Sequence, residues 1–401
     1  MYQAENTQSP SNLNFENTEI AFRSKTNSDL QRSFLLFKAI GYNWLVKLGT
    51  PLIEFAFSIK LPIVGLIKAT VFKQFCGGET MNECDPTMKA LHEYGIGSIL
   101  DYSVEGKEAE AEFEHTTKET IETIEKAGHN PMIPFCVFKV TGVARFDLLA
   151  KVNDKAALSQ SEQVEFDKIN ERVERICKTA YNNGVRIFID AEETWIQDAI
   201  DALAREMMLK FNNETAIIYN TIQFYRHDRF AFLKNSFEDA LKHNYQLGIK
   251  LVRGAYMEKE AARAQTFGYP NPIQPNKESS NNDYNDALLF CVNKIERISI
   301  CAGTHNEQSS MLLANLMMQN GIQPNDKRIY FSQLFGMSDH ISYNLSSAGY
   351  NVAKYLPYGP VKSVMPYLFR RAAENTSVKG QSGRELGLIA KEVKRRKKAN
   401  N

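Results

Sequence analysis

The sequence predicts an α/β protein organised as a (β/α)8 TIM-like barrel that follows an N-terminal helical segment. Three observations lead to this prediction. Eight short apolar runs rich in Ile, Val, Phe and Tyr follow one another from residue 97 onward. Longer stretches that carry apolar residues at helical spacing separate these runs. The chain has 401 residues, which is enough for a barrel of about 250 residues and additional segments.

The composition is that of an ordinary globular protein. Hydrophobic residues make up 43% and charged residues 24%, and 48 Lys and Arg against 47 Asp and Glu give a net charge of +1. This balance offers no general electrostatic basis for binding nucleic acid. The six cysteines form no Cys-x-x-Cys pair, which indicates reduced thiols in a reducing compartment.

No apolar stretch has the length of a membrane-spanning helix, because Glu54, Lys60 and Lys68 interrupt the richest one, 51–72. The polar, Asn-rich start resembles neither a signal peptide nor a mitochondrial transit peptide. We therefore expect a soluble or peripheral protein in the cytoplasm and on the inner membrane of a bacterium. For a eukaryotic source, we expect the mitochondrial inner membrane.

Two segments precede the barrel. Residues 1–28 are predicted to be a disordered tail. Residues 29–96 form a helical segment and arm, in which 30–76 is apolar and basic and a short helix over 85–95 follows. The apolar, basic part suits a helix that covers a core and equally one that lies on a membrane surface.

Residues 97–380 are expected to form the barrel domain. Its strands are expected at 98–103, 132–140, 185–193, 216–225, 247–256, 298–305, 328–334 and 352–359. The alternative is a doubly wound open sheet, but the chain has neither a G-x-G-x-x-G motif nor a P-loop for its switch point. Residues 381–401 are predicted to be a basic tail that is either solvated or docked on anionic lipid.

Polar side chains end the predicted strands, at the face where barrels carry their chemistry. They are Asp101, Glu105, Lys139, Asp190, Glu192, Gln223, Lys250, Arg253, Tyr256, Thr304, His305, Ser332, Gln333 and Tyr355. This charge-balanced set suits an anionic or zwitterionic ligand. The sequence has no metal-ligand spacing and no nucleophile elbow, so the chemistry needs acid–base catalysis or an organic cofactor.

A helix over 360–375 follows the eighth strand and places more polar groups at the same face. Tyr367, Arg371 and Glu374 lie at i, i+4 and i+7 on one stripe, with Arg370 beside it. Two guanidinium groups can bind one carboxylate or phosphate in a bidentate manner. The spacing therefore indicates a ligand role for this helix.

Three motifs carry a resemblance to a known family. LVRGAYMEKEAARAQTFGYPNPI (251–273), YFSQLFGMSDHIS (330–342) and KYLPYGPVKSVMPYLFRRAAENTS (354–377) closely resemble proline dehydrogenase, in particular its single-function, eukaryotic-type branch. The resemblance extends from about residue 35 to residue 377. It implies a distorted barrel with FAD across its C-terminal face, oxidation of L-proline to Δ1-pyrroline-5-carboxylate, and transfer of electrons to a membrane quinone.

The resemblance also implies a role for individual residues. Lys139, Arg370 and Arg371 match the residues that pair with the substrate carboxylate, and Asp190 matches a supporting aspartate. Glu105 matches a gate residue that pairs with Arg370. The walls around the substrate ring match Tyr256, Leu334, Tyr355 and Tyr367. The cofactor positions match Gln223, Val252, Arg253, Gly254, Ala255, Thr304, His305, Asn306 and Glu374, together with Gln333 and with Lys250, where many relatives carry Arg.

Three alternatives remain beside L-proline oxidation. Hydroxyproline dehydrogenase has the same chemistry, but the bulky Tyr355 argues against it because a 4-hydroxyl would have little room. A barrel that has lost catalysis and serves as a proline sensor would lack a substrate or flavin residue, and none is missing. An unrelated phosphate-binding lyase would keep a Gly-rich loop after the last strands, which 355–360 does not supply.

Overall fold

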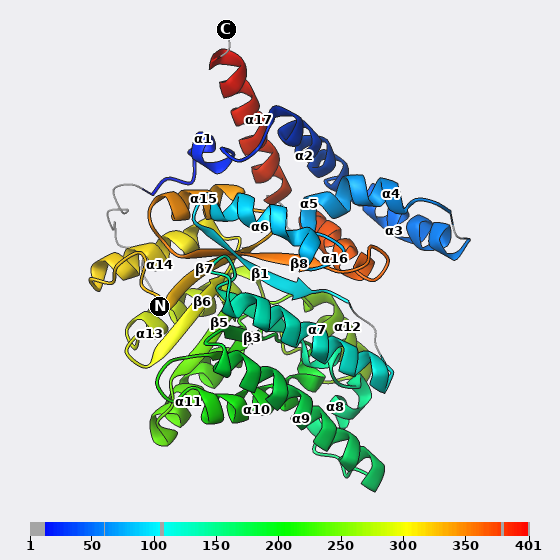
Figure 1. Cartoon of the computed structure of the whole chain (residues 1–401), viewed down its shortest axis with the longest axis vertical. Coiled ribbons are helices and arrows are strands. Elements are labelled where there is room, and N and C mark those ends of the chain that lie inside the picture. Colours follow the sequence, from blue (N-terminus) through cyan, green and yellow to red (C-terminus); the bar gives the residue numbers. More distant parts are fainter. Residues whose placement is uncertain (1–12, 60, 105–107, 378–380, 400–401) are drawn as a thin grey trace.

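The computed structural model describes residues 13–59, 61–104, 108–377 and 381–399. Eight parallel strands close into one barrel in sequence order, and β8 pairs with β1, which confirms the predicted (β/α)8 fold (Figure 1). The strands are β1 (Ile96–Tyr102), β2 (Phe135–Phe138), β3 (Arg186–Ile189), β4 (Ile218–Gln223), β5 (Leu247–Val252), β6 (Ile298–Gly303), β7 (Ile329–Leu334) and β8 (Val352–Tyr358). They overlap the predicted runs because strands buried on both faces read as apolar stretches.

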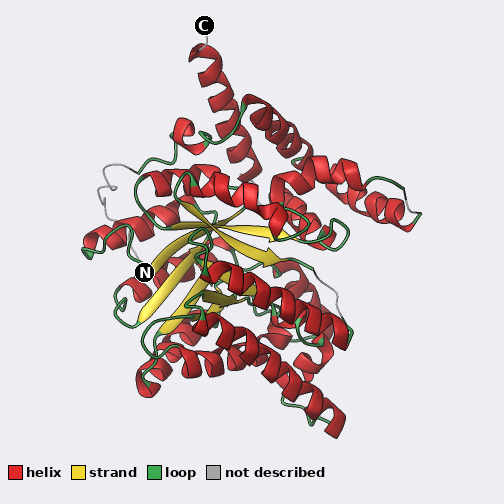
Figure 2. Ribbon diagram, in the orientation of Figure 1, coloured by secondary structure: helices red, strands yellow, loops and turns green. Residues whose placement is uncertain are grey.

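Helices surround the strands in the alternating pattern that the sequence predicts (Figure 2). Those that follow β1 to β7 are α7 (Glu110–Gly128), α8 (Phe146–Asn153), α9 (Gln160–Asn182), α10 (Thr194–Phe211), α11 (Arg229–His243), α12 (Met257–Phe267), α13 (Lys277–Val292), α14 (Glu307–Gln319) and α15 (Asp339–Ser347). The main hydrophobic core lies between their inner faces and the barrel wall. A sheet whose outer face is covered in this way leaves its strand ends as the accessible surface.

Aromatic side chains fill the inside of the barrel below the strand ends. Phe135 stacks on Phe188 with ring centroids 4.5 Å apart, and Tyr219 meets both rings edge-on. These three residues precede Lys139, Asp190 and the end of β4 on their strands, so they lie deeper in the barrel than the polar groups. They form an apolar floor that excludes water from below the predicted site.

A second core joins the two ends of the chain on the outside of the barrel. Its N-terminal helices are α1 (Thr18–Ala21), α2 (Asn27–Ile40), α3 (Asn43–Ser58), α4 (Val64–Ile67), a π-helical turn (Lys68–Phe72) and α5 (Lys73–Phe75), whereas the next helix, α6 (Asp85–His92), packs against β1 as part of the main core. Its C-terminal helices are α16 (Met365–Ser377) and α17 (Gln381–Ala399). Apolar side chains from α2, α5, α16 and α17 pack together there, and Figure 1 shows α2 and α17 next to each other. The expected N-terminal helical segment thus covers α16, the helix that follows the last strand.

Where the structure describes the chain ends, at 13–28 and 381–399, they differ from the disordered N-terminal tail and the basic C-terminal tail that the sequence suggests, whereas residues 1–12 and 400–401 lie outside the described residues. Leu13, Phe15 and Phe22 are buried, and α17 packs against α1 and α2. Arg396 donates hydrogen bonds to the carbonyl oxygens of Phe22 and Lys25. Part of the basic charge of residues 381–399 therefore holds the N-terminal segment in place.

The length and apolarity of the described helices show whether any of them could cross a membrane. Within the ranges given above, no helix combines the length and the apolarity needed to cross a membrane.

Candidate active site

A cavity of about 710 Å³ opens at the C-terminal ends of the strands. Of the predicted site residues, it brings together Lys139, Asp190, Gln223, Lys250, Val252, Arg253, Gly254, Ala255, Tyr256, Thr304, His305, Asn306, Gln333, Leu334, Tyr355, Tyr367, Arg370 and Arg371. Glu105 lies outside the described residues. Glu374 belongs to α16, but its side chain is not among those described. The arrangement shows that these residues share one cavity, while their individual roles stay predictions.

Asp190, directly after β3, lies between two lysines. Its Oδ1 accepts a hydrogen bond from Lys250 Nζ, and its Oδ2 lies 3.8 Å from Lys139 Nζ. Lys250 Nζ also donates to the Tyr355 hydroxyl oxygen over 2.5 Å and lies 4.7 Å from the centroid of that ring. Lys250, predicted as a cofactor contact, thus fixes the positions of Asp190 and Tyr355.

Helix α16 brings two arginines to the same part of the cavity. The Arg371 guanidinium lies 5.1 Å from the centroid of the Tyr367 ring, which is one helical turn earlier. Arg371 is buried, and Arg370 lines the cavity beside it. We call Lys139, Asp190, Lys250 and Tyr355, together with these two arginines, the paired-charge region.

A second part of the cavity holds its arginine with neutral groups. Arg253 Nε donates to Asn281 Oδ1 over 2.8 Å, and its two terminal nitrogens donate to Thr304 Oγ1 over 2.7 Å and Ser309 Oγ over 2.8 Å. Among the described residues no carboxylate forms an ion pair with it. Burial lowers the pKa of Arg253. The guanidinium is therefore positioned by its neighbours without being neutralised by them.

His305 extends this second part toward α15. Its Nδ1 lies 2.8 Å from Ser338 Oγ. Burial, with the nearby positive charges of Lys354 and Arg371, lowers the pKa of His305 to about 3, so the imidazole is neutral at pH 7. We call Arg253, Thr304, His305, Ser309 and Ser338 the hydroxyl region.

The Arg-Gly-Ala-Tyr motif after β5 needs its glycine for steric reasons. Gly254 has a φ of +125°, and a Cβ at this position would clash with the ring of Tyr225. The turn brings Gly254, Ala255 and Tyr256 to the cavity. Burial and the neighbouring Glu192 raise the pKa of Tyr256 well above its usual value, so its hydroxyl stays protonated.

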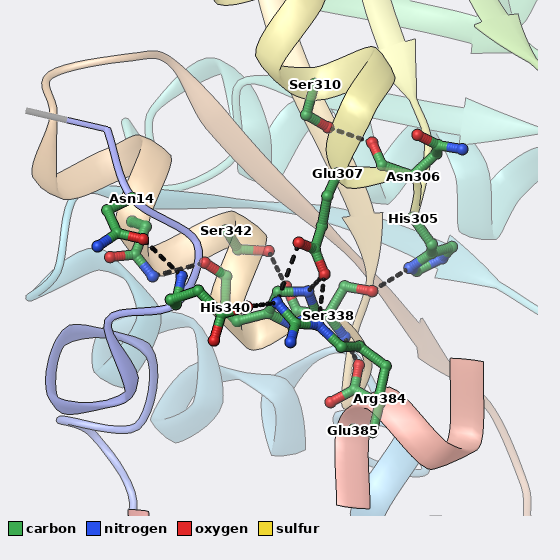
Figure 3. Close-up of polar contacts among 12 residues, drawn as sticks. Asn14, His305, Asn306, Glu307, Ser310, Ser338, His340, Ser342, Arg384 and Glu385 are labelled. Carbon is green, nitrogen blue, oxygen red and sulfur yellow. Dashed lines mark hydrogen bonds and ion pairs between the residues drawn. The ribbon is translucent and has the colours of Figure 1, made fainter. Parts of the chain in front are cut away.

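A polar network beyond His305 was not predicted from the sequence (Figure 3). Glu307 accepts hydrogen bonds from Arg384 and pairs with His340 Nε2 at 3.0 Å. The Ser338 amide donates to Glu385 over 2.5 Å. All five of these residues line the cavity. The network joins α14, α15 and α17 at the end of the cavity that the hydroxyl region forms.

The environment of Glu192 could not be predicted from the sequence either. It is buried, and its carboxylate accepts hydrogen bonds from the Thr141 amide over 3.1 Å and the Thr141 hydroxyl over 2.5 Å. Burial raises the pKa of Glu192 to about 7. The carboxylate lines a neighbouring cavity of about 530 Å³ that shares Lys139, Tyr256 and Arg370 with the first one.

Comparisons with known proteins agree on one family. The family model described as proline dehydrogenase matches residues 84–384. "Proline dehydrogenase 1, mitochondrial" of Dictyostelium discoideum is 33% identical, over 98% of this chain and 76% of the relative. "Hydroxyproline dehydrogenase" of Xenopus laevis is 30% identical, over 94% of this chain and 88% of the relative.

A solved structure shares the fold. The crystal structure of proline utilization A (PutA) from Bdellovibrio bacteriovorus matches 95% of this chain with a TM-score of 0.72 and 20% identity. The chain spans 42% of the length of that protein. At this identity, the likeness concerns the arrangement of strands and helices alone.

Proposed function

The chain belongs to the proline dehydrogenase family of oxidoreductases, and on that premise we propose that it oxidises L-proline to Δ1-pyrroline-5-carboxylate with FAD as cofactor. The electrons would pass to a quinone in a membrane, the bacterial inner membrane or its mitochondrial counterpart. The observation that carries this proposal is the paired-charge region, which lies in the same cavity as three tyrosines.

The paired-charge region suits a small zwitterion. Lys139, Arg370 and Arg371 are three cationic side chains that line the same cavity, and together they would bind the substrate carboxylate. Asp190 stays ion-paired with Lys139 and Lys250, so it sets the position of Lys139 without removing all of the positive charge. Holding the carboxylate at one end orients the rest of a small substrate, which is the main contribution that a protein makes to such a reaction.

The aromatic side chains suit the other end of the substrate. Tyr256, Tyr355 and Tyr367 line the cavity together with Leu334. A pyrrolidine ring is largely apolar, so contact with these rings would bind it and exclude water. The apolar floor formed by Phe135, Phe188 and Tyr219 closes the barrel below.

The hydroxyl region fits an anionic or strongly polar cofactor. Arg253 is fixed by three neutral partners and keeps a charge that a flavin could use. Thr221 Oγ1 is buried at the cavity wall and has no hydrogen-bond partner in the structure. When bound, FAD supplies the two-electron oxidant for the substrate. The cavity volume lies within the range of about 300–1,000 Å³ that is usual for ligand sites.

Visible spectroscopy of the purified protein tests this proposal directly. We expect a bound flavin whose absorbance near 450 nm is lost when L-proline is added without oxygen. Bound flavin that L-proline cannot reduce would contradict the substrate. A protein that takes up no FAD would contradict the cofactor and the use of the cavity.

Hydroxyproline is the second candidate substrate, because the Xenopus laevis relative bears that name. The geometry at Tyr355 favours L-proline. Its hydroxyl is held by Lys250 and its side chain is buried, so the phenol cannot easily move to admit a 4-hydroxyl group. We expect trans-4-hydroxyproline to reduce the flavin more slowly than L-proline, and a faster reduction by hydroxyproline would reverse the assignment.

A further inference from the structure

Helix α3 carries apolar side chains on both of its faces. Ile53 and Phe57 pack against the second core. On the opposite face, Trp44, Leu48, Leu52 and Phe55, together with Ile59 directly after the helix, are each between 51% and 64% exposed. They lie at i, i+4, i+8, i+11 and i+15, so they form a single stripe, which we call the α3 stripe. A helix that is apolar on all sides is normally buried, whereas α3 packs one face against the protein and exposes the other to solvent.

Exposed apolar side chains are concentrated around this stripe. Of the large hydrophobic residues that are exposed in the described part of the chain, nine of fifteen lie within 35–66. Beside the stripe they include Leu61 and Leu66, which follow α3 in the chain. Such a concentration of exposed apolar side chains indicates a surface that binds another molecule or a membrane.

Basic side chains accompany the stripe. Residues 43–73 contain four Lys and one Glu, a net charge of 4 − 1 = +3. Lys38 on α2 and Lys73 on α5 are exposed and form no ion pair within the described residues. Lys362, just before α16, lies with its Nζ 5.5 Å from the ring of Phe57, on the inner face of α3 and not on the stripe. Lys68 pairs with Glu79 and Glu83. The positive charge near α3 that no described carboxylate pairs therefore includes Lys38 and Lys73, on the helices before and after it.

This composition favours a lipid surface over a second copy of the chain. The cores of protein interfaces are depleted of Lys, whereas helices that lie in a membrane surface combine Trp, Phe and Leu on one side with Lys at the edge. Tyr42 and Trp44 at the start of α3 are the residue types that favour the boundary between lipid and water. The 16 residues of α3 span about 24 Å at 1.5 Å per residue, which is too short to cross the hydrocarbon layer and long enough to lie in its surface.

We propose that the α3 stripe inserts into the surface of an anionic lipid bilayer and anchors the enzyme there. The inner face of α3 packs on α16, the helix that carries Tyr367, Arg370 and Arg371. Figure 1 shows α3 beside α16, so insertion of the stripe holds the helix that lines the cavity close to the lipid. The inference rests on the proposed function in one respect, because it explains how an acceptor dissolved in the membrane reaches the cavity.

Tryptophan fluorescence provides a direct test, because the chain has only two tryptophans, Trp44 and Trp195. Trp195 lies on α10 with its ring 4.5 Å from the Arg263 guanidinium and does not line the main cavity. In a Trp195→Phe variant, vesicles of phosphatidylcholine and phosphatidylglycerol should shift the Trp44 emission to shorter wavelength. Brominated acyl chains in the same vesicles should quench it. The matched Trp44→Phe variant, which reports only on Trp195, should show neither effect, and an unchanged Trp44 emission would overturn the proposal.

Charge insertion on the stripe gives a second test. Leu48→Glu/Phe55→Glu should weaken sedimentation with these vesicles at least tenfold. Val164→Glu/Leu241→Glu changes two exposed apolar residues on α9 and α11 and should leave sedimentation unchanged. If the stripe variant binds vesicles as well as the parent but no longer forms an oligomer seen by light scattering, the stripe is a contact between copies and the proposal fails.

A water-soluble electron acceptor separates this inference from the proposed function. Reduction of a dye by L-proline should be the same in the parent and in both double variants, which also shows that the variants fold. Absence of this activity in the parent would contradict the proposed function and leave the vesicle results readable. Activity with dye but no vesicle binding by the parent would contradict the anchor alone.

Discussion

The two regions of the cavity place their charges differently. In the paired-charge region, Asp190 has a lysine at each of its oxygens, and Lys250 also contacts Tyr355. In the hydroxyl region, Arg253 contacts an amide and two hydroxyls, and His305 is neutral. Residues of both regions line one cavity at the barrel mouth, so the difference lies in the partners of the charged groups.

This difference separates two tasks. Separating a buried ion pair leaves each charge without a partner, which costs free energy. The ion pairs of the paired-charge region therefore hold their side chains in fixed positions. A buried guanidinium held by neutral groups keeps its charge for a ligand and requires no reorganisation when one binds. The paired-charge region therefore suits a small substrate that must be oriented, and the hydroxyl region suits a polar cofactor that stays bound.

The largest effect should come from breaking the pair at Asp190. Asp190→Asn leaves the positive charges of Lys250 and Lys139 without their carboxylate, and we expect the free energy of unfolding to fall by about 3–5 kcal/mol. Urea denaturation measures the change. The double variant Asp190→Asn/Lys250→Met should recover much of the loss, because it also removes the stranded charge. An Asp190→Asn protein as stable as the parent would show that the pairing does not fix the region.

Arg371→Ala should act on the substrate and not on the fold. Loss of a charge-assisted contact to the carboxylate corresponds to about 3 kcal/mol, or on the order of 100-fold in kcat/KM for L-proline. The flavin content should stay that of the parent. Pyrrolidine, which lacks the carboxylate, should react equally well with both proteins. A loss of activity that is equal for pyrrolidine and L-proline would place Arg371 outside the carboxylate contact.

Two arginines that differ in their partners sharpen the comparison further. Arg253→Gln removes a charge that has no carboxylate partner among the described residues, so we expect FAD binding to weaken by about 2 kcal/mol while stability in the absence of FAD is retained. Arg229 is more deeply buried than Arg253, and its Nη1 lies 2.6 Å from Asp201 Oδ2. Arg229→Gln should lower stability and leave FAD affinity unchanged. Similar losses of stability in both variants would remove the distinction between the two regions.

The fold and most of the cavity could be predicted because their signals are local. Each strand is an apolar run with polar residues at its end, so the residues that converge on the cavity, such as Asp190 and Lys250, can be found one strand at a time. Glu307, His340 and Arg384 come from three helices, and Arg384 lies 77 residues from its partner Glu307. Nothing in the local sequence connects them.

The chain ends were harder to predict for the same reason. The basic residues of α17 read as a solvated tail because, apart from Glu392, which pairs with Arg395 and Arg396 within the helix, their acidic partners are far away in the sequence. Arg384 binds Glu16, from which it is separated by 368 positions, and Arg395 binds Glu19. A run of basic residues predicts a solvated or lipid-bound segment only when no distant segment supplies acidic partners. Whether such a segment lies nearby is known only from the folded structure.

The smallest of the expected effects concerns His305 and the acid stability of the hydroxyl region. Its pKa in the folded protein is about 3, whereas an unfolded histidine titrates near 6.5. Between these values the unfolded state binds one more proton, so stability is full above about pH 6.5 and falls as the pH decreases, by up to roughly 1.4 kcal/mol per pH unit. His305→Gln should flatten the dependence of the urea midpoint on pH between about 6.5 and 5.5. Replacement of the exposed His129 by Gln should leave the slope unchanged. A slope that survives the His305 substitution would mean that the imidazole is protonated in the folded protein, and that the hydroxyl region carries a second positive charge beside Arg253.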